Sequence, residues 1–315
     1  MSGDRVAAID CGTNSLRMLI ADRDDSGQLI DVCRVGEIVR LGQGVDKTGL
    51  LDPQALERTR LALLTFADLI ELHDAEAIRM VATSATRDAG NRQDFVDMVH
   101  AVLNVEPEVV SGVEEASLSF HGAVMGLPDL SGRALVTDIG GGSTELVLGP
   151  AGTSAATSEL LQAFSMDIGC VRLTERHFHD DPPTAEQIAA AEADIRAALS
   201  EAVTHVPVTP EVTMVGVAGS VTTLAGIVMD MPAYDPVANH GFVLSRADVD
   251  RVAQQLLTAT AAQRRAIPVM HPGRADIIAA GVLILRTLMD VYATNSIVIS
   301  EHDILDGIAA SIETS

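Results

Sequence analysis

Residues 134–149 read Ala-Leu-Val-Thr-Asp-Ile-Gly-Gly-Gly-Ser-Thr-Glu-Leu-Val-Leu-Gly. An apolar run ends on an acid, three glycines and a hydroxyl residue follow, and a second apolar run begins at Leu146. The pattern predicts two antiparallel strands joined by a turn whose glycines let backbone N–H groups approach an anion closely. Ser143 and Thr144 would add hydroxyl donors, and Asp138 would hold a divalent cation beside a phosphate. Taken alone, the string also fits an ordinary tight turn with a capping aspartate.

A second copy of this pattern lies near the N-terminus. Residues 6–20 align with residues 134–148 without gaps, at an offset of 128 positions (138 minus 10). The acid, the turn glycine and the hydroxyl residue all recur, with Asp10, Gly12 and Ser15 falling on Asp138, Gly140 and Ser143. The chain therefore reads as an internal duplication. We expect two similar domains that face one another across an active-site cleft and hold a phosphate from both sides.

The composition indicates a globular α/β protein. With 315 residues, 47% of them hydrophobic, the chain is long enough for two domains with their own cores. Its longest apolar stretch near the C-terminus, residues 277–285, is shorter than the roughly 18 residues that cross a bilayer. The N-terminus has no apolar signal core. Cys11, Cys33 and Cys170 are widely spaced and fit reduced thiols, with Cys11 interpreted as a small buried strand residue rather than a reactive one. We expect a cytoplasmic protein with no membrane partner.

The net charge of −23 argues against a nucleic-acid partner, because duplex binding depends on clustered lysine and arginine. Lys47 is the only lysine. A polyanionic substrate would therefore have to be attracted locally, by backbone N–H groups, a few arginines and metal ions. The excess acid is interpreted as a solvated surface.

Apolar spacing and turn signals predict the same order of elements in both halves. In the first half the hairpin is followed by a third strand to residue 41, a helix over 53–73 capped by Asp52, a strand over 77–82, a helix over 93–103 and a strand over 108–111. In the second half the expected elements are a third strand over 158–166, helices over 185–203 and 246–258, a strand over 212–217, an apolar helix to 291, a strand over 296–300 and a helix over 303–312. This is the order of a ribonuclease H-like domain, present twice.

Other segments supply candidate site residues. Residues 83–91 are small and hydroxyl-bearing, include Arg87, and follow a strand, so they suit an anion loop. Residues 216–224 form a glycine-rich turn into a helix N-terminus, a third candidate phosphate site. Glu115 lies in the first turn of a helix that links the halves, where a carboxylate could activate water. Acids at such a position can also simply complement the helix dipole.

Residues 176–183 contain two histidines and two acids, but prolines bound the run and no partner cluster accompanies it. We interpret it as a solvent loop rather than a metal site. Residues 272–276 are expected to cap the apolar helix that follows, with Arg274 in its opening turn.

Six strings occur in order along the chain and carry a resemblance to a known family. They are DCGTNS (10–15), TSATR (83–87), SGVEEA (111–116), DIGGGSTE (138–145), GSVTT (219–223) and PGRAD (272–276). They closely resemble the exopolyphosphatase and guanosine pentaphosphate phosphohydrolase family, which belongs to the superfamily of sugar kinases, actin and heat-shock chaperone ATPases. The resemblance implies the actin-like ATPase fold in a short two-domain form, with one domain made of residues 1–124 plus 300–315 and the other of residues 125–299. Residues 300–307 depart from the family's usual string, which affects the expectation for that local turn only.

The resemblance also implies roles for single residues. Glu115 matches the general base, with Glu114 as the second candidate, and Arg87 and Arg274 match basic residues that contact the polyanion. The acids matched to Mg²⁺, or Mn²⁺ in its place, are Asp138 and Glu145, which also orient water, together with Asp10 of the other hairpin. The residues expected to bind substrate are Gly12, Thr13, Asn14, Ser15, Gly140, Gly141, Gly142, Ser143, Thr144, Gly219, Ser220 and Arg274.

The activity implied is that of an exopolyphosphatase. Glu115 would deprotonate a water that attacks the terminal phosphoanhydride of inorganic polyphosphate, and orthophosphate would leave. Guanosine pentaphosphate is the alternative substrate, and a homodimer is expected from the family. A small-molecule kinase of the same fold is disfavoured because no added acceptor subdomain is evident. A non-catalytic sensor is disfavoured because the carboxylates are retained.

Overall fold

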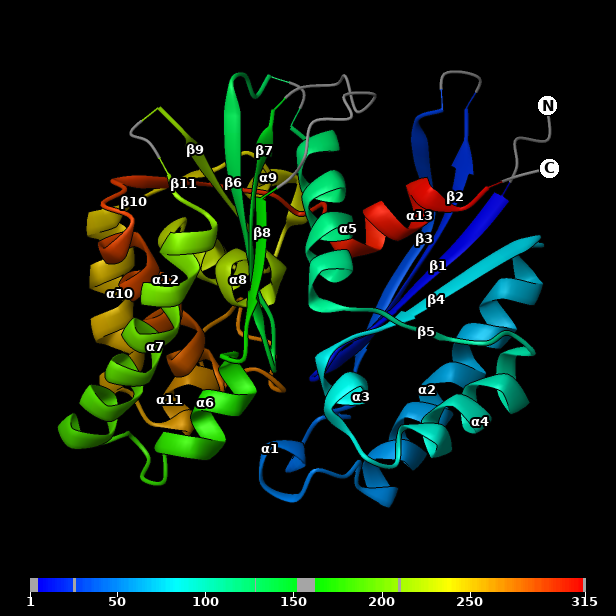
Figure 1. The fold of residues 1–315 in the computed structure, drawn as a ribbon, viewed down its shortest axis with the longest axis horizontal. Coiled ribbons are helices and arrows are strands. Elements are labelled where there is room, and N and C mark those ends of the chain that lie inside the picture. The colour runs from blue at the N-terminus through cyan, green and yellow to red at the C-terminus, as the bar shows by residue number, and fades with distance from the viewer. Residues whose placement is uncertain (1–4, 25–26, 128, 152–161, 209–210, 314–315) are drawn as a thin grey trace. The chain divides into compact units, whose positions relative to one another are not determined.

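Two mixed β-sheets carry the fold, one in each of two units of the chain (Figure 1). One unit consists of Met1–Gly122 and Ile304–Ser315, and the other of Ala123–Asp303. The computed structural model describes residues 5–24, 27–127, 129–151, 162–208 and 211–313. Within that part of the chain, no helix combines the length and the apolar character needed to cross a membrane.

The sheet of the first unit has the strand order β3-β2-β1-β4-β5, and its elements follow one another along the chain as expected for a ribonuclease H-like domain. Its strands are β1 (Arg5–Cys11), β2 (Ser15–Arg23), β3 (Leu29–Ile38), β4 (Ala77–Ala82) and β5 (Glu108–Val109). The first three are antiparallel neighbours, and β4 and β5 add in parallel. Both faces of this sheet are covered, because side chains alternate along each strand. Ala7 and Ile9 pack with one apolar cluster, and Val6 and Ala8 pack with another.

Helices on the two faces supply these clusters (Figure 1). α2 (Pro53–Leu72) and α4 (Arg92–Leu103) cover one face, and α13 (Ile304–Ser311) covers the other. α2 begins as predicted, since Asp52 accepts hydrogen bonds from the N–H groups of Gln54 and Ala55. The remaining helices are α1 (Val45–Thr48), α3 (Ser84–Asp88) and α5 (Gly112–Met125).

The sheet of the second unit repeats the central strands of the first sheet. Its order is β10-β11-β9-β6-β7-β8. The strands are β6 (Arg133–Ile139), β7 (Thr144–Pro150), β8 (Gln162–Met166), β9 (Thr213–Val217), β10 (Val243–Ser245) and β11 (Ser296–Ile299). β6 occupies the place of β1, with β7 antiparallel on one side and β9 parallel on the other. The predicted duplication is therefore confirmed in the strands. The first four residues of the strand expected over 158–166 lie outside the described residues.

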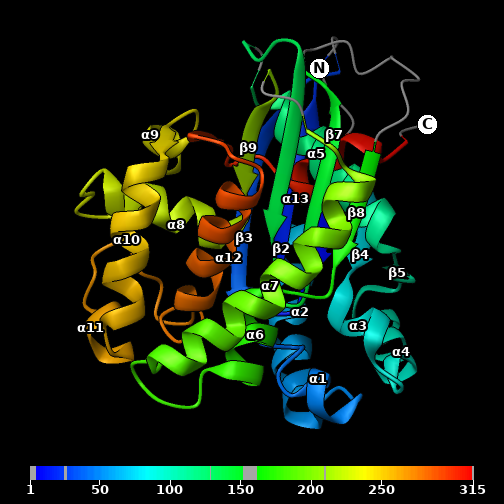
Figure 2. The same ribbon diagram turned by 60° about the vertical axis from the view of Figure 1, so that its left-hand side comes forward.

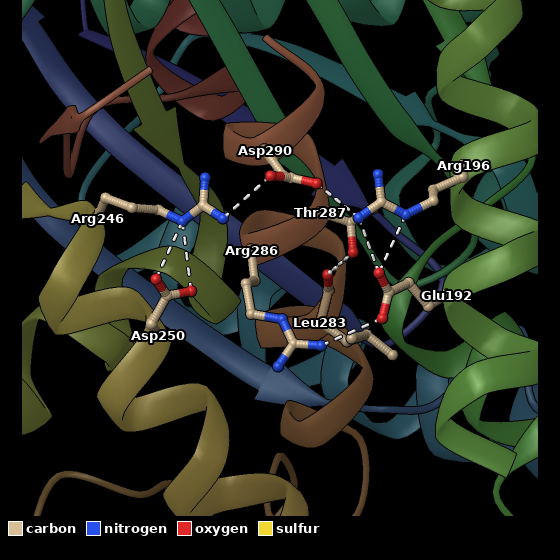
Figure 3. Close-up of polar contacts among 8 residues, drawn as sticks. All are labelled: Glu192, Arg196, Arg246, Asp250, Leu283, Arg286, Thr287 and Asp290. Atoms are coloured by element: carbon tan, nitrogen blue, oxygen red, sulfur yellow. Dashed lines mark hydrogen bonds and ion pairs between the residues drawn. The ribbon is translucent and has the colours of Figure 1, made fainter. Parts of the chain in front are cut away.

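The helices of the second unit are α6 (Cys170–His177), α7 (Ala185–His205), α8 (Ala218–Val228), α9 (Pro236–Asn239), α10 (Arg246–Thr258), α11 (Ala261–Arg265) and α12 (Ile278–Val291). Of these, α6, α7, α8 and α10 pack against α12. α12 is buried along almost its whole length and packs against α7 and α10 (Figure 2). A helix that is apolar all round is typical of a core position. On the outer side, ion pairs join the three helices (Figure 3).

Three local expectations are wrong. Arg176 and His177 belong to the last turn of α6 rather than to a loop, and both contact Oδ2 of Asp194, at 3.3 and 3.0 Å. Arg274 precedes α12, which begins at Ile278, because residues 272–277 form turns. The expected loop over residues 83–91 contains the short helix α3. In each case a few residues adopt a conformation that tertiary contacts decide, and local sequence is a weak guide to such segments.

Candidate active site

The N-terminal hairpin turn is closed by its own backbone and tied to α3. The N–H of Gly12 donates to the carbonyl of Ser15 at 2.9 Å. The hydroxyl groups of Thr13 and Ser84 are 2.9 Å apart and hydrogen-bonded. Because Ser84 begins α3, this bond links the turn to the helix that carries Arg87.

Asp10 forms an ion pair within this hairpin. Its Oδ2 atom accepts hydrogen bonds from Nη2 of Arg17 at 2.6 Å and from Nε at 3.0 Å, and the aspartate is almost fully buried. The two residues are directly opposite on β1 and β2. Arg17 was not among the predicted site residues. The signal was available, because at the offset of 128 Arg17 falls on Glu145 (145 minus 17).

Glu115 and Arg87 lie in contact, as two of the predicted catalytic residues. Nη1 of Arg87 donates to Oε2 of Glu115 at 2.9 Å and to the carbonyl of Val110 at 3.1 Å. Glu115 is 7% exposed, whereas the neighbouring Glu114 is exposed. The guanidinium forms an ion pair with the carboxylate and orients it.

The second hairpin, formed by β6 and β7 and called the C-terminal hairpin here, places two carboxylates side by side. Asp138 and Glu145 are directly opposite on β6 and β7, and both are buried. Residues paired in this way have Cβ atoms about 5 Å apart on the same face of the sheet. Ser165 of β8 donates its hydroxyl hydrogen to Oε1 of Glu145 at 2.8 Å, which fixes that side chain.

Asp138 and Glu145 suit a magnesium ion that takes the rest of its ligands from water and from substrate phosphate. Within the described ranges, no three or more histidine, cysteine, aspartate or glutamate side chains are grouped so that they could hold a metal. Mg²⁺ commonly takes only one or two protein carboxylates and completes its octahedron with water and phosphate oxygens. The donor set at Asp138 and Glu145 is therefore of the right kind for Mg²⁺, or for Mn²⁺.

The glycines of the two turns do not depend on a left-handed backbone conformation. None of Gly12, Gly140, Gly141 and Gly142 has a positive φ angle. At Gly140, an added Cβ would lie 3.1 Å from the carbonyl oxygen of Ser143. One predicted donor is used inside the protein. The hydroxyl of Thr144 donates to the carbonyl of Ile168 at 2.7 Å, and Thr144 is fully buried, so it supports β7.

The third candidate phosphate site lies at the start of α8. Ala218, which precedes Gly219, has a φ of 67°, a left-handed conformation that non-glycine residues seldom adopt outside functional or strained positions. The Arg274 guanidinium lies against the Cα of Gly219, where any side chain would overlap it. Nη1 of Arg274 is 3.4 Å from the hydroxyl of Thr223. Ser220 is buried and lies against Gly281 of α12.

Cys170 connects this region to the C-terminal turn. Its N–H donates to the carbonyl of Gly140 at 2.9 Å, and its thiol interacts with Ser220 and Arg274. Burial raises the pKa of the Cys170 thiol to about 11. Burial, aided by the charge of Asp10, also raises the pKa of Cys11 well above its ordinary value. The interpretation of Cys11 as a buried strand residue is confirmed.

Known proteins are similar to this chain over both of its units. A model of the Ppx/GppA phosphatase family matches residues 19–315. Exopolyphosphatase 2 of Mycobacterium tuberculosis is 47% identical over 99% of this chain and 99% of its own length. The crystal structure of an exopolyphosphatase-like protein covers 98% of both chains with a TM-score of 0.92 and 42% identity. A Ppx/GppA family member from Aquifex aeolicus has a TM-score of 0.80 and 30% identity over 98% of this chain and 96% of its own.

Proposed function

Because the chain belongs to the Ppx/GppA phosphatase family, we propose that it is an exopolyphosphatase, which hydrolyses the terminal phosphoanhydride of inorganic polyphosphate and releases orthophosphate. The observation that carries this proposal is the buried Glu115 carboxylate, held at 2.9 Å by Arg87 of α3, the helix whose Ser84 is hydrogen-bonded to Thr13 of the first hairpin turn. The similarity to an exopolyphosphatase over the full chain supports the choice of polyphosphate.

In this proposal Glu115 is the general base. Its carboxylate takes a proton from the water that attacks the terminal phosphorus, and the bridging oxygen of the phosphoanhydride leaves with the shortened chain. Arg87 fixes the direction of the carboxylate and offsets negative charge on the transferring group. Phosphoryl transfer depends mainly on such positioning and charge neutralisation.

The other predicted residues would bind the substrate and its metal. Asp138 and Glu145 would hold Mg²⁺, which when bound neutralises phosphate charge and fixes phosphate oxygens. The turns at residues 12–15 and 140–143 would bind phosphates through backbone N–H groups. Arg274 would contact a phosphate from the start of α8.

Replacing Glu115 by glutamine tests the proposal. The amide cannot accept the proton, so kcat for phosphate release from polyphosphate should fall by about 10²–10⁴-fold, while KM changes little. The matched control is Glu114→Gln, which alters the exposed neighbour in the same helical turn and should retain normal turnover. Phosphate release is measured in parallel on short polyphosphate, long polyphosphate and guanosine pentaphosphate with Mg²⁺.

Two results would contradict the proposal. Normal turnover by Glu115→Gln would remove Glu115 from the base role. If the wild type released phosphate from guanosine pentaphosphate but not from either polyphosphate, guanosine pentaphosphate would replace polyphosphate as the proposed substrate.

A further inference from the structure

We propose that the first turn of α6, with the Arg172 side chain, is a positioning element that aims three backbone N–H groups of the C-terminal turn at a bound phosphate. The inference rests on the proposed function, since it concerns the same turn. It assigns Arg172 and Gly169 a role in substrate binding that acts through the backbone of residues 140–143.

All three glycine carbonyls of this turn are bound from the α6 side. The N–H of Cys170 donates to the carbonyl of Gly140 at 2.9 Å, and the N–H groups of Val171 and Arg172 donate to that of Gly141 at 2.9 and 3.1 Å. Nε of Arg172 donates to the carbonyl of Gly142 at 2.7 Å. The N–H groups that a helix leaves unpaired at its start are here paired with the turn.

Planarity of the peptide group then fixes where the turn's own N–H groups point. In a trans peptide the N–H of each residue points opposite to the carbonyl of the residue before it. With three carbonyls directed at α6, the N–H groups of Gly141, Gly142 and Ser143 are directed away from it. None of these three N–H groups donates to an acceptor among the described residues. Consecutive N–H groups with a common direction form an anion-binding concavity.

The contact between the start of α6 and the turn depends on the residue at position 169. A Cβ atom on Gly169 would overlap the carbonyl group of Gly141 and lie 2.6 Å from the nitrogen of Gly142. The φ of Gly169 is −150°, which any residue can adopt. Glycine is therefore required for space, because the start of α6 lies directly against the turn.

The first unit uses the same arrangement in different elements. The N–H of Gly42 donates to the carbonyl of Thr13 at 2.8 Å, and that of Arg40 donates to the carbonyl of Asn14 at 2.9 Å. Thr13 and Asn14 fall on Gly141 and Gly142 at the offset of 128. A Cβ on Gly42 would overlap the methyl group of Thr13. In both units, N–H groups of the segment that follows the third strand donate to the carbonyl groups of the hairpin turn.

The test combines a donor deletion with a donor replacement. Arg172→Met keeps an apolar stem and removes the donor to Gly142, and Arg172→Lys restores one donor. Arg265→Met is the control, since it removes an exposed arginine from the same unit. Binding of inorganic tripolyphosphate is measured by calorimetry without divalent metal, and KM and kcat for polyphosphate are measured with Mg²⁺.

We expect Arg172→Met to bind tripolyphosphate about tenfold more weakly, the scale of one weakened hydrogen bond to a charged group. KM should rise accordingly with a smaller change in kcat. Arg172→Lys should recover part of the affinity, and Arg265→Met should match the wild type. A thermal melt of each variant separates loss of folding from loss of binding.

A glycine variant gives an independent measurement. Gly169→Ala should also weaken tripolyphosphate binding, whereas Gly226→Ala, whose added Cβ would meet only ordinary contacts at 3.4 Å or more, should not. If Gly169→Ala does not fold, the Arg172 pair decides. Wild-type affinity in Arg172→Met would overturn the inference. Absence of phosphate release from polyphosphate by the wild type with Mg²⁺ would instead overturn the proposed function.

Discussion

One pair of equivalent positions in the two hairpins carries opposite charges, with Arg17 in the first hairpin and Glu145 in the second. Asp10 lies opposite Arg17, whereas Asp138 lies opposite Glu145. A carboxylate that a guanidinium binds at 2.6 Å already has a cation beside it, and two carboxylates paired on one face of a sheet provide two oxygen ligands for a divalent cation. We therefore expect the resident cation at the C-terminal hairpin and a smaller metal role for Asp10 than the sequence resemblance implies.

Metal titrations of two matched variants test this difference. Asp138→Asn should raise the Mg²⁺ concentration for half-maximal phosphate release by at least about tenfold, because it weakens a direct ligand. Asp10→Asn removes the same charge from the other hairpin and should shift the Mg²⁺ requirement much less, although it leaves Arg17 without this partner. An equal shift in both variants would mean that Asp10 is itself a metal ligand.

Three helices of the second unit are joined by ion pairs at one aspartate (Figure 3). Asp290 of α12 pairs with Arg196 of α7 at 2.6 Å and with Arg246 of α10 at 3.3 Å. Hydrogen bonds from Arg196 and then Arg246 hold the pKa of Asp290 below its ordinary value. The Asp290 side chain is 44% exposed, so water and salt screen these interactions.

Asp290→Asn should lower the free energy of unfolding by about 1 kcal/mol or less at neutral pH and low salt. Since folding lowers this pKa, the stabilisation is present above the unfolded-state pKa and is lost as the pH falls through the folded-state value. Urea unfolding at several pH values and salt concentrations measures the effect. Asp250→Asn, which removes a partner of Arg246 alone, should have a smaller effect. A difference between Asp290→Asn and wild type that persists in high salt or acid would contradict an electrostatic origin.

The sequence predicted the long elements because their signals are local. Strong apolar periodicity and a proline-containing cap defined α2, and the two glycine turns defined the hairpins. α6 was missed because its start is fixed by contact with the turn at Gly141, and β10 because it has only three residues. Such short elements depend on tertiary contacts that no window of sequence contains.

The candidate site was predictable to the extent that side chains carry it. Motifs singled out Glu115, Asp138 and Glu145 as candidates. Arg172 and Gly169 act on backbone carbonyls, and a carbonyl acceptor has no signature in the sequence. Arg17 was identifiable only by comparing the two copies position by position. Thr144 illustrates the opposite case, since a hydroxyl in a motif proved to be bound to Ile168 inside the core.

At the scale of the whole molecule, the first unit is assembled from both ends of the chain. Ile304, Leu305 and Ile308 of α13 form one cluster with Val6 and Leu19 of the first hairpin. Arg23 of β2 donates to the carbonyls of Ala309, Ala310 and Ile312 at 3.0–3.1 Å, which pairs acceptors at the helix end. Arg34 of β3 binds the buried Asp306 at 2.5 Å.

Ile308→Ala should therefore destabilise the first unit in particular. Replacing a fully buried isoleucine by alanine costs about 2–5 kcal/mol, through lost apolar burial and the cavity that remains. Ile30→Ala, at an exposed position of β3 in the same unit, should change stability by no more than about 0.5 kcal/mol. Hydrogen–deuterium exchange should show faster exchange in β1 of Ile308→Ala and unchanged protection in β6. Equal loss of protection in both strands would show that the two units unfold as one.

The position of α13 also has a consequence for biosynthesis. The second unit is continuous in sequence, so all of its strands and helices have been made once residue 303 is added. The first unit begins earlier, but the face of β1 that bears Val6 and Ala8 has no α13 to cover it until the ribosome has added residues 304–311. Although domains generally fold in the order of their synthesis, here the half that begins first is completed last. A nascent chain of this protein therefore lacks the α13 side of this apolar cluster until residues 304–311 have been added.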